Sequence, residues 1–79
     1  MKVFVTELQG KNIMTADGKY LGQVDNVVVD TNSGELQHLL VIPTEEIDIR
    51  DYKTDRTGRV VLPFSKIKSM KDVIILKPL

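Results

Sequence analysis

The four consecutive apolar residues at positions 39–42 most constrain what this chain can fold into. They read Leu39-Leu40-Val41-Ile42, and Pro43, which cannot donate a ladder hydrogen bond, ends the run. Successive side chains of a strand point to opposite faces, so this run places apolar side chains on both faces of its sheet. A sheet with one wet face cannot cover both sets. The run therefore predicts a closed barrel, or a sheet covered by a partner.

The rest of the chain consists of short β-prone runs separated by glycine and proline. The Asp17-Gly18 pair is typical of a hairpin turn, and residues 30–34 form a second turn that ends at Gly34. Gly22, inside a long β-prone run, indicates a bend, a bulge or a close backbone approach. We expect strands at residues 11–15, 20–29, 36–42, 59–62 and 73–76, and a helical turn at 64–68 that plugs one end of a barrel. This spacing predicts a small all-β barrel, whose closure removes exposed edges.

The length of 79 residues supports one domain spanning residues 1–79. A chain this short buries too little surface for a wide margin of stability, and it has no cysteine for disulfides, so we expect oligomerisation to add stability. No apolar run approaches the roughly 18–20 residues that span a bilayer, and the first residues lack a secretory pattern. We therefore expect a cytoplasmic protein without membrane insertion.

The charges balance overall but not along the chain. Residues 1–58 carry six basic and ten acidic side chains, a net charge of −4, whereas residues 59–79 carry five basic and one acidic, a net charge of +4. This asymmetry can orient a partner or a second copy of the chain. Alternatively, the fold mixes the two halves over one surface and the asymmetry has no consequence.

The residues that could support catalysis are few. His38 is the only histidine, and it lies inside an apolar strand, where a structural role is more typical than that of a general base. The serines near turns, Ser33, Ser65 and Ser69, lack a nucleophile-elbow context, and no glycine-rich loop precedes a helix to hold phosphate. We therefore expect no enzyme activity and no cofactor.

Two charged clusters have a functional and a simpler interpretation. Carboxylates gather at Glu45, Glu46, Asp48, Asp51 and Asp55. They could hold calcium or magnesium, but the spacing matches no EF-hand loop, and a solvated acidic loop without metal is the expected reading. Lys66, Lys68 and Lys71, with Lys77, could contact phosphates. They lack interleaved aromatic residues, so a solubilising surface is expected and nucleic acid is the less favoured partner.

The segment after Pro43 contains the strongest candidates for partner contact. Ile47, Ile49 and Tyr52 alternate with charged residues, which is typical of an extra strand or arm that adds to another molecule. The alternative is that Ile47 and Ile49 fold back to cover their own barrel. A second candidate contact is the face of the third expected strand around His38 and Leu40.

The turns and core positions together resemble the PRC-barrel family, named after the photosynthetic reaction centre H subunit. The resemblance rests on Asp17-Gly18 with the strand from Tyr20 to Asp30, on Ser33-Gly34-Glu35-Leu36, on the apolar run ending at Ile42, on Leu62-Pro63-Phe64-Ser65-Lys66-Ile67, and on Lys71-Asp72-Val73-Ile74-Ile75-Leu76. It covers nearly the whole chain, and residues 44–57 are the least typical part. The Pro-Phe-Ser and Lys-Asp-Val pieces are most similar to small stand-alone archaeal members.

The resemblance implies a six-stranded barrel-like β domain that acts as an adaptor. Relatives include the H subunit and the C-terminal barrel of the ribosome maturation factor RimM. Archaeal proteins similar to this one take part in FtsZ-based cell division as homodimers or heterodimers and bind the membrane anchor SepF. The family offers no catalytic residues to carry over. We therefore expect a non-enzymatic, dimeric adaptor whose partners are itself, a paralogous PRC-barrel chain or SepF, and the alternative is a ribosome- or RNA-associated assembly factor resembling RimM.

Overall fold

Six strands form one sheet in the computed structural model, which describes residues 4–78. In chain order the elements are α1 (Val5–Leu8), β1 (Asn12–Met14), β2 (Tyr20–Val29), β3 (Leu36–Pro43), η1 (Ile49–Asp51), β4 (Val60–Pro63), η2 (Phe64–Lys66), β5 (Ile67–Met70) and β6 (Val73–Leu76). The strand order across the sheet is β4-β3-β2-β1-β6-β5. All neighbours are antiparallel except β1 and β6, which run parallel. The all-β class and the six strands implied by the family resemblance are confirmed.

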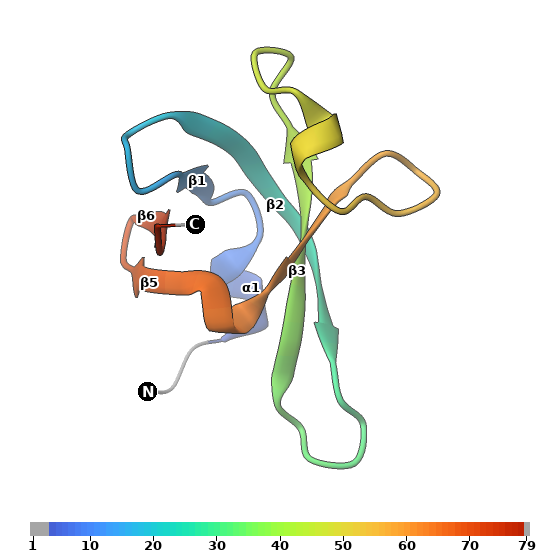
Figure 1. The fold of residues 1–79 in the computed structure, drawn as a ribbon. Coiled ribbons are helices and arrows are strands. Elements are labelled where there is room, and N and C mark those ends of the chain that lie inside the picture. The colour runs from blue at the N-terminus through green and yellow to red at the C-terminus, as the bar shows by residue number, and fades with distance from the viewer. Residues whose placement is uncertain (1–3, 79) are drawn as a thin grey trace.

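The sheet curls into a half-barrel that is not closed by strand pairing (Figure 1). β4 and β5 are its two edges, and within residues 4–78 no ladder joins them. The outer edge of β4 is partly covered by the preceding loop, because Thr54 bridges Val60 and the Val61 N–H donates to the Lys53 carbonyl at 2.8 Å. The expected closed barrel is therefore not formed by the described residues. The sheet is curled but open, and the loop before β4 protects the edge of that strand.

The long hairpin of β2 and β3 is the centre of the fold, and its turn extends away from the other strands (Figure 1). Gly18 and Gly34 occupy the two expected turns with φ of 86° and 74°. Gly22 marks a close backbone approach, because a Cβ atom there would lie 2.1 Å from the Ile42 carbonyl oxygen. A register irregularity between Ile13 and Met14 lies opposite this point. The prediction for Gly22 is confirmed.

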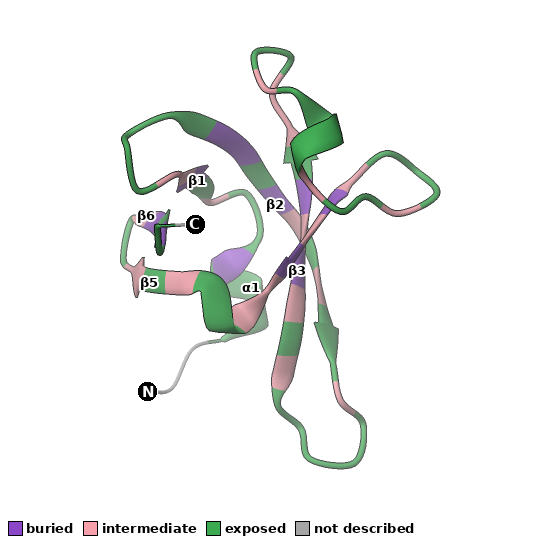
Figure 2. Cartoon of the chain, viewed as in Figure 1, coloured by how far each residue is buried: buried purple, intermediate pink, exposed green. Residues whose placement is uncertain are grey.

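The core lies on the concave side of the curled sheet (Figure 2). Its members are buried aliphatic side chains from α1 and from every strand except β5, namely Leu8, Ile13, Leu21, Val24, Leu39, Val41, Val60, Leu62, Ile74 and Leu76. No polar or charged side chain in residues 4–78 is buried. Strand alternation therefore sorts the apolar run at 39–42, since Leu39 and Val41 point inward and their neighbours point outward.

Two elements differ from the sequence expectation. The helical turn predicted for residues 64–68 ends at Lys66, and Ile67 begins β5, a strand the pattern did not predict. A bulge between Ile67 and Ser69 breaks the two-residue alternation, so the strand signal is lost. The four-residue helix α1 was also not predicted, because it is too short to show helical periodicity, although its Leu8 is fully buried.

Candidate interaction surfaces

The outer face of β2, β3 and β4 presents an apolar surface. The strand register places Val28 opposite His38, His38 opposite Pro63, and Leu40 opposite Val61. We call the residues Val28, His38, Leu40, Ile42, Val61 and Pro63 the outer face. Ile42 is 50% exposed and Val28 is 41% exposed, while the other four are half-buried. Leu40 and Ile42, the two residues of the apolar run that do not point into the core, therefore lie on a face that no other element of the described chain covers fully.

The outer face carries no net charge. Its polar neighbours in the register are Asn26 and Gln23, which lie opposite Leu40 and Ile42. The nearest charges along the chain, Asp25 next to Asn26 and Arg59 next to Val60, form an ion pair across β3. The Arg59 Nε lies 2.5 Å from Oδ2 of Asp25 in a contact that is ionic and is not a directed hydrogen bond. The face is thus apolar in its middle and neutral at its border.

The edges of the sheet are poor surfaces for adding another strand. The loop before β4 already uses backbone groups of Val60 and Val61, and Pro63 has no N–H to offer. β5 is only four residues long, contains a bulge and carries the exposed Lys68. Short, bulged and lysine-bearing edges resist pairing with other strands. The apolar faces are therefore better placed for contact than the edges.

The predicted contact residues after Pro43 are divided by the structure. Ile47 packs against the core, as the alternative reading expected, and so does Tyr52. Ile49, which that reading also placed on the barrel, instead begins the short helix η1 and is 45% exposed. The segment forms no strand of the sheet beyond the bridge at Thr54. Partner contact by these three residues stays a prediction. In the second candidate set, His38 and Leu40 lie side by side on the outer face.

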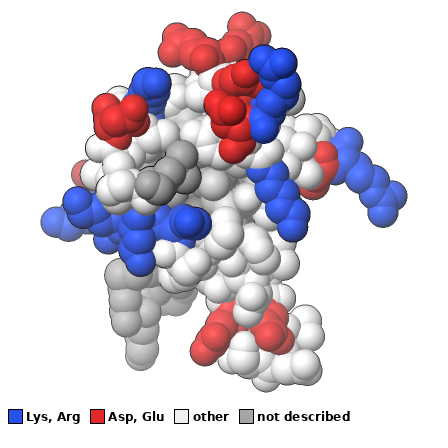
Figure 3. Space-filling model, in the orientation of Figure 1, with Lys and Arg blue, Asp and Glu red and all other residues white. Residues whose placement is uncertain are grey.

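Side chains of one charge gather in parts of the surface, although the two signs also lie side by side elsewhere (Figure 3). Figure 3 shows acidic side chains at the top of the view, where the segment after β3 lies, and basic side chains at the left beside β5 and β6. Lys66, Lys68 and Lys71 are exposed at the two ends and the bulge of β5. The Lys11 ammonium donates to the Lys71 carbonyl at 2.8 Å and adds a further positive charge beside this strand.

Three carboxylates are stabilised by hydrogen bonds within their own turns. The Thr15 hydroxyl lowers the pKa of Asp17, the Arg50 guanidinium lowers the pKa of Asp48, and the Thr57 hydroxyl lowers the pKa of Asp55. The Arg50 Nη2 lies 2.8 Å from Asp48 Oδ2, and the Thr57 hydroxyl lies 2.7 Å from Asp55 Oδ1. These carboxylates cap local backbone, so they serve turns and not a shared site.

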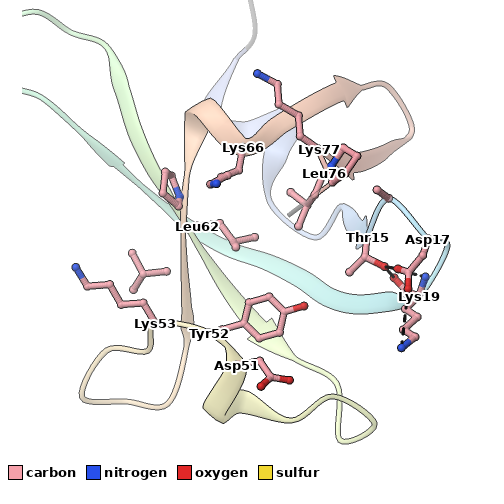
Figure 4. Close-up of a pocket in the computed structure, with 14 residues that line it drawn as sticks. Thr15, Asp17, Lys19, Asp51, Tyr52, Lys53, Leu62, Lys66, Leu76 and Lys77 are labelled. Carbon is pink, nitrogen blue, oxygen red and sulfur yellow. Dashed lines mark hydrogen bonds and ion pairs between the residues drawn. The ribbon is translucent and has the colours of Figure 1, made fainter.

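A groove of about 780 Å³ opens on the concave side of the half-barrel (Figure 4). It is lined by the β1–β2 turn, by the end of η1 and the two residues after it, by β4, by η2, and by the end of β6 and the two residues after it. These residues are Thr15, Ala16, Asp17, Lys19, Asp51, Tyr52, Lys53, Val61, Leu62, Pro63, Lys66, Leu76, Lys77 and Pro78. The ring of Tyr52 and the side chains of Leu62 and Leu76 face the same space. The groove adjoins the outer face at β4, because Val61 and Pro63 belong to both.

The residues expected to be weak catalytic candidates are not assembled into a site. No hydrogen bond within residues 4–78 joins His38 to a serine or a carboxylate, and Ser33 instead accepts from the Glu35 N–H. No three His, Asp or Glu side chains of the described chain come together in a group suited to a metal ion. None of the described helices has the length and apolar character needed to cross a membrane.

The arrangement of strands and turns is matched by a known family. The family model for the PRC-barrel domain matches residues 1–79. The chain belongs to the PRC-barrel family. PRC-barrel domains are generally binding modules without catalysis, which agrees with the surfaces described above. No functionally curated protein matches this sequence.

Solved structures with the same fold include a longer protein. A chain of Pseudomonas aeruginosa named as a 16S ribosomal RNA processing protein, RimM, superimposes with a TM-score of 0.66 at 17% sequence identity. The match covers 95% of this PRC-barrel chain and 43% of the RimM chain, so this chain spans less than half the length of that relative. At this identity the likeness establishes the shared fold.

Sequence reasoning found part of the outer face and missed the groove. It named His38 and Leu40 but not Val28, Ile42 or Val61, although counting the register back from the turn at residues 30–34 would have placed Val28 opposite His38. The groove was missed entirely, because its walls come from five separated parts of the chain. No pattern of neighbouring residues predicts a site of this kind.

Proposed function

We propose that this PRC-barrel protein is a non-enzymatic binding module that self-associates through its outer face. The observation that carries the proposal is the apolar surface that the exposed Val28 and Ile42 form with the half-buried Leu40 on the neighbouring strands β2 and β3. Exposed apolar side chains gathered on one sheet face are typical of interaction sites, whereas single exposed ones need no explanation.

A second copy of the same chain suits this face for two reasons. A two-fold interface places the same patch against itself, so an uncharged patch with a neutral border brings no like charges together. A standard interface buries about 800 Å² per partner. That area is about one-seventh of the 5659 Å² accessible surface of this chain, so a single face of the sheet is the scale of surface that such a dimer needs.

The role we propose for the dimer is that of an adaptor in FtsZ-based cell division, with SepF or a paralogous PRC-barrel chain as a further partner. The support is the resemblance of the segments around Phe64 and Lys71 to small stand-alone archaeal members of the family. Calorimetric titration of the purified protein with SepF tests this role, and the absence of heat at any concentration ratio contradicts it.

A second candidate function is that of a ribosome- or RNA-associated assembly factor. The fold likeness to the RimM chain and the positive charges of Lys66, Lys68 and Lys71 along β5 favour it. Binding that depends on phosphate contacts weakens steeply as salt rises. Retention on RNA that falls with added salt supports this function, and a flat response removes it.

Light scattering after size exclusion tests the self-association directly. We expect the unmodified chain to run as a dimer and the Val28→Glu/Ile42→Glu variant to run as a folded monomer, because both substituted side chains lie on the outer face. Ile75→Glu is the matched control, since Ile75 is 37% exposed on β6, away from this face. A monomeric unmodified chain contradicts the proposal, as does a dimer that survives the double substitution.

A further inference from the structure

The groove on the concave side carries an excess of positive charge, which self-association through the outer face does not use. Its lining contains four lysines and two aspartates, a local excess of positive charge in a chain whose net charge is zero. The Asp17 carboxylate accepts a hydrogen bond from the Thr15 hydroxyl, and its Oδ2 lies 3.9 Å from the Lys19 ammonium. Among the described residues that line the groove, Asp51 is therefore the one carboxylate left to offset Lys53, Lys66 and Lys77.

Backbone hydrogen bonds fix the positions of the other three lysines, Lys53, Lys66 and Lys77. The Lys77 N–H donates to the Lys66 carbonyl at 2.7 Å, which fixes the chain end beside η2. The Lys53 carbonyl accepts from the Val61 N–H at 2.8 Å, which fixes the loop beside β4. Within residues 4–78 the ammonium groups of Lys53, Lys66 and Lys77 make no ion pair. Their positions are set while their charges stay available.

The floor between these charges is apolar. Leu62 and Leu76 are nearly fully buried at the base of the groove, and the half-buried Tyr52 ring stands beside them (Figure 4). An apolar floor inside a positively charged rim is complementary to a ligand that has apolar side chains flanked by negative charges.

We propose that this groove binds an extended acidic peptide segment of a partner protein. Apolar side chains of the peptide seat against Tyr52, Leu62 and Leu76, and its carboxylates pair with Lys53, Lys66 and Lys77. A small anion could contact only one or two of these lysines, because they lie on different walls of the groove. Nucleic acid fits less well, since the described residues of the groove include one aromatic ring, two carboxylates and no arginine.

This site gives the protein a second surface beside the outer face. A module that pairs with its own copy on one face and holds a partner's peptide in the groove can bridge two proteins. The two surfaces meet at Val61 and Pro63, but the lysines of the peptide site and its floor of Tyr52, Leu62 and Leu76 lie outside the outer face.

The test is a fluorescence-anisotropy titration with a labelled peptide of alternating acidic and apolar residues. A length of about eight residues suits the probe, because an extended chain rises about 3.3 Å per residue and the middle extent of the molecule is 27 Å. The same peptide with lysine in place of its acidic residues, and a labelled single-stranded RNA, serve as comparison probes.

The variant Lys53→Gln/Lys66→Gln/Lys77→Gln removes the charges of the rim. Its matched control is Arg56→Gln/Lys68→Gln/Lys71→Gln, which removes three exposed charges elsewhere. We expect the groove variant to weaken acidic-peptide binding about tenfold, the sum for three exposed charge pairs, and the control to change it by less than about twofold. Circular dichroism and thermal melting establish that both variants fold.

Three outcomes would overturn the proposal. The first is equal weakening by both variants, which indicates attraction to net charge alone. The second is binding of RNA without binding of the acidic peptide. The third is a shift in dimerisation caused by the groove variant, which assigns the groove to the acidic segment of a second copy. The Val28→Glu/Ile42→Glu variant should bind the peptide with unchanged affinity, so failure of the dimer and failure of the groove are separable.

Discussion

Substitution of Gly22 by alanine tests the closest backbone approach in the fold. Gly22 lies opposite Pro43 where β2 and β3 pair, at a φ of 156°. A Cβ atom there would stand 2.1 Å from the Ile42 carbonyl oxygen and 3.0 Å from the Pro43 Cα. Both neighbours are backbone atoms, so the clash cannot be relieved by rotating a side chain.

The size of the effect follows from this geometry. The Ile42 oxygen must retreat by more than about 1 Å to reach an ordinary contact, and overpacking of this kind costs about 1–3 kcal/mol. The retreat also stretches the hydrogen bond from the Thr44 N–H to the Leu21 carbonyl, now 2.9 Å, whose loss costs about 1 kcal/mol. We therefore expect Gly22→Ala to lower the free energy of unfolding by about 3 kcal/mol. For a chain of this size the corresponding fall in Tm is about 12–24 °C.

Urea unfolding followed by circular dichroism measures this loss. Gly34→Ala is the control, because Gly34 also has a positive φ, of 74°, but a Cβ atom there meets nothing within 4 Å. The control isolates the backbone strain of a left-handed residue, about 1 kcal/mol. If the two variants unfold at the same urea concentration, the argument from close approach of β2 and β3 is refuted.

Three further experiments test the core, the ion pair and the turns. Leu39→Ala should lower the free energy of unfolding by about 2–5 kcal/mol because Leu39 is fully buried, whereas Ile49→Ala should lower it by less than about 1 kcal/mol; equal losses would contradict the assigned core. A double-mutant cycle on Asp25 and Arg59, each about one-third exposed, should give a coupling below about 1 kcal/mol that shrinks with salt, and a larger, salt-independent value contradicts this. The hydrogen bonds that lower the pKa of Asp55 stabilise the fold above the unfolded pKa near 3.8, and this stabilisation is lost as the pH falls through the lower folded pKa. Asp55→Asn should therefore flatten the acid limb of the stability profile below about pH 4, and an unchanged acid limb would contradict that role.

The strands that could be predicted are those with local signals. Neighbouring residues are enough to predict three features, and the structure has all of them: the turn at Asp17-Gly18, the turn ending at Gly34, and the strand formed by the apolar run before Pro43. β5 could not be predicted in this way, because its bulge interrupts the alternation on which a strand signal depends. Its place in the sheet is set by pairing with β6.

The surfaces were less accessible to sequence reasoning than the strands. A pattern shows that both faces of β3 are apolar, but it does not show which face the curl of the sheet leaves open. Likewise, Ile47, Ile49 and Tyr52 look equivalent in the sequence, yet the structure packs the first and third on the core and exposes the second. Burial is decided by packing between distant segments, which local spacing does not encode.

The most direct test of the central claim is the dependence of backbone amide NMR shifts on protein concentration. Dilution separates a dimer into monomers, and only amides near the interface change their surroundings. We predict shift changes at Val28, from His38 to Ile42 and at Val61, with the 44–52 segment unaffected. Changes confined to the segment around Ile49, or no changes at any concentration, would contradict self-association through the outer face.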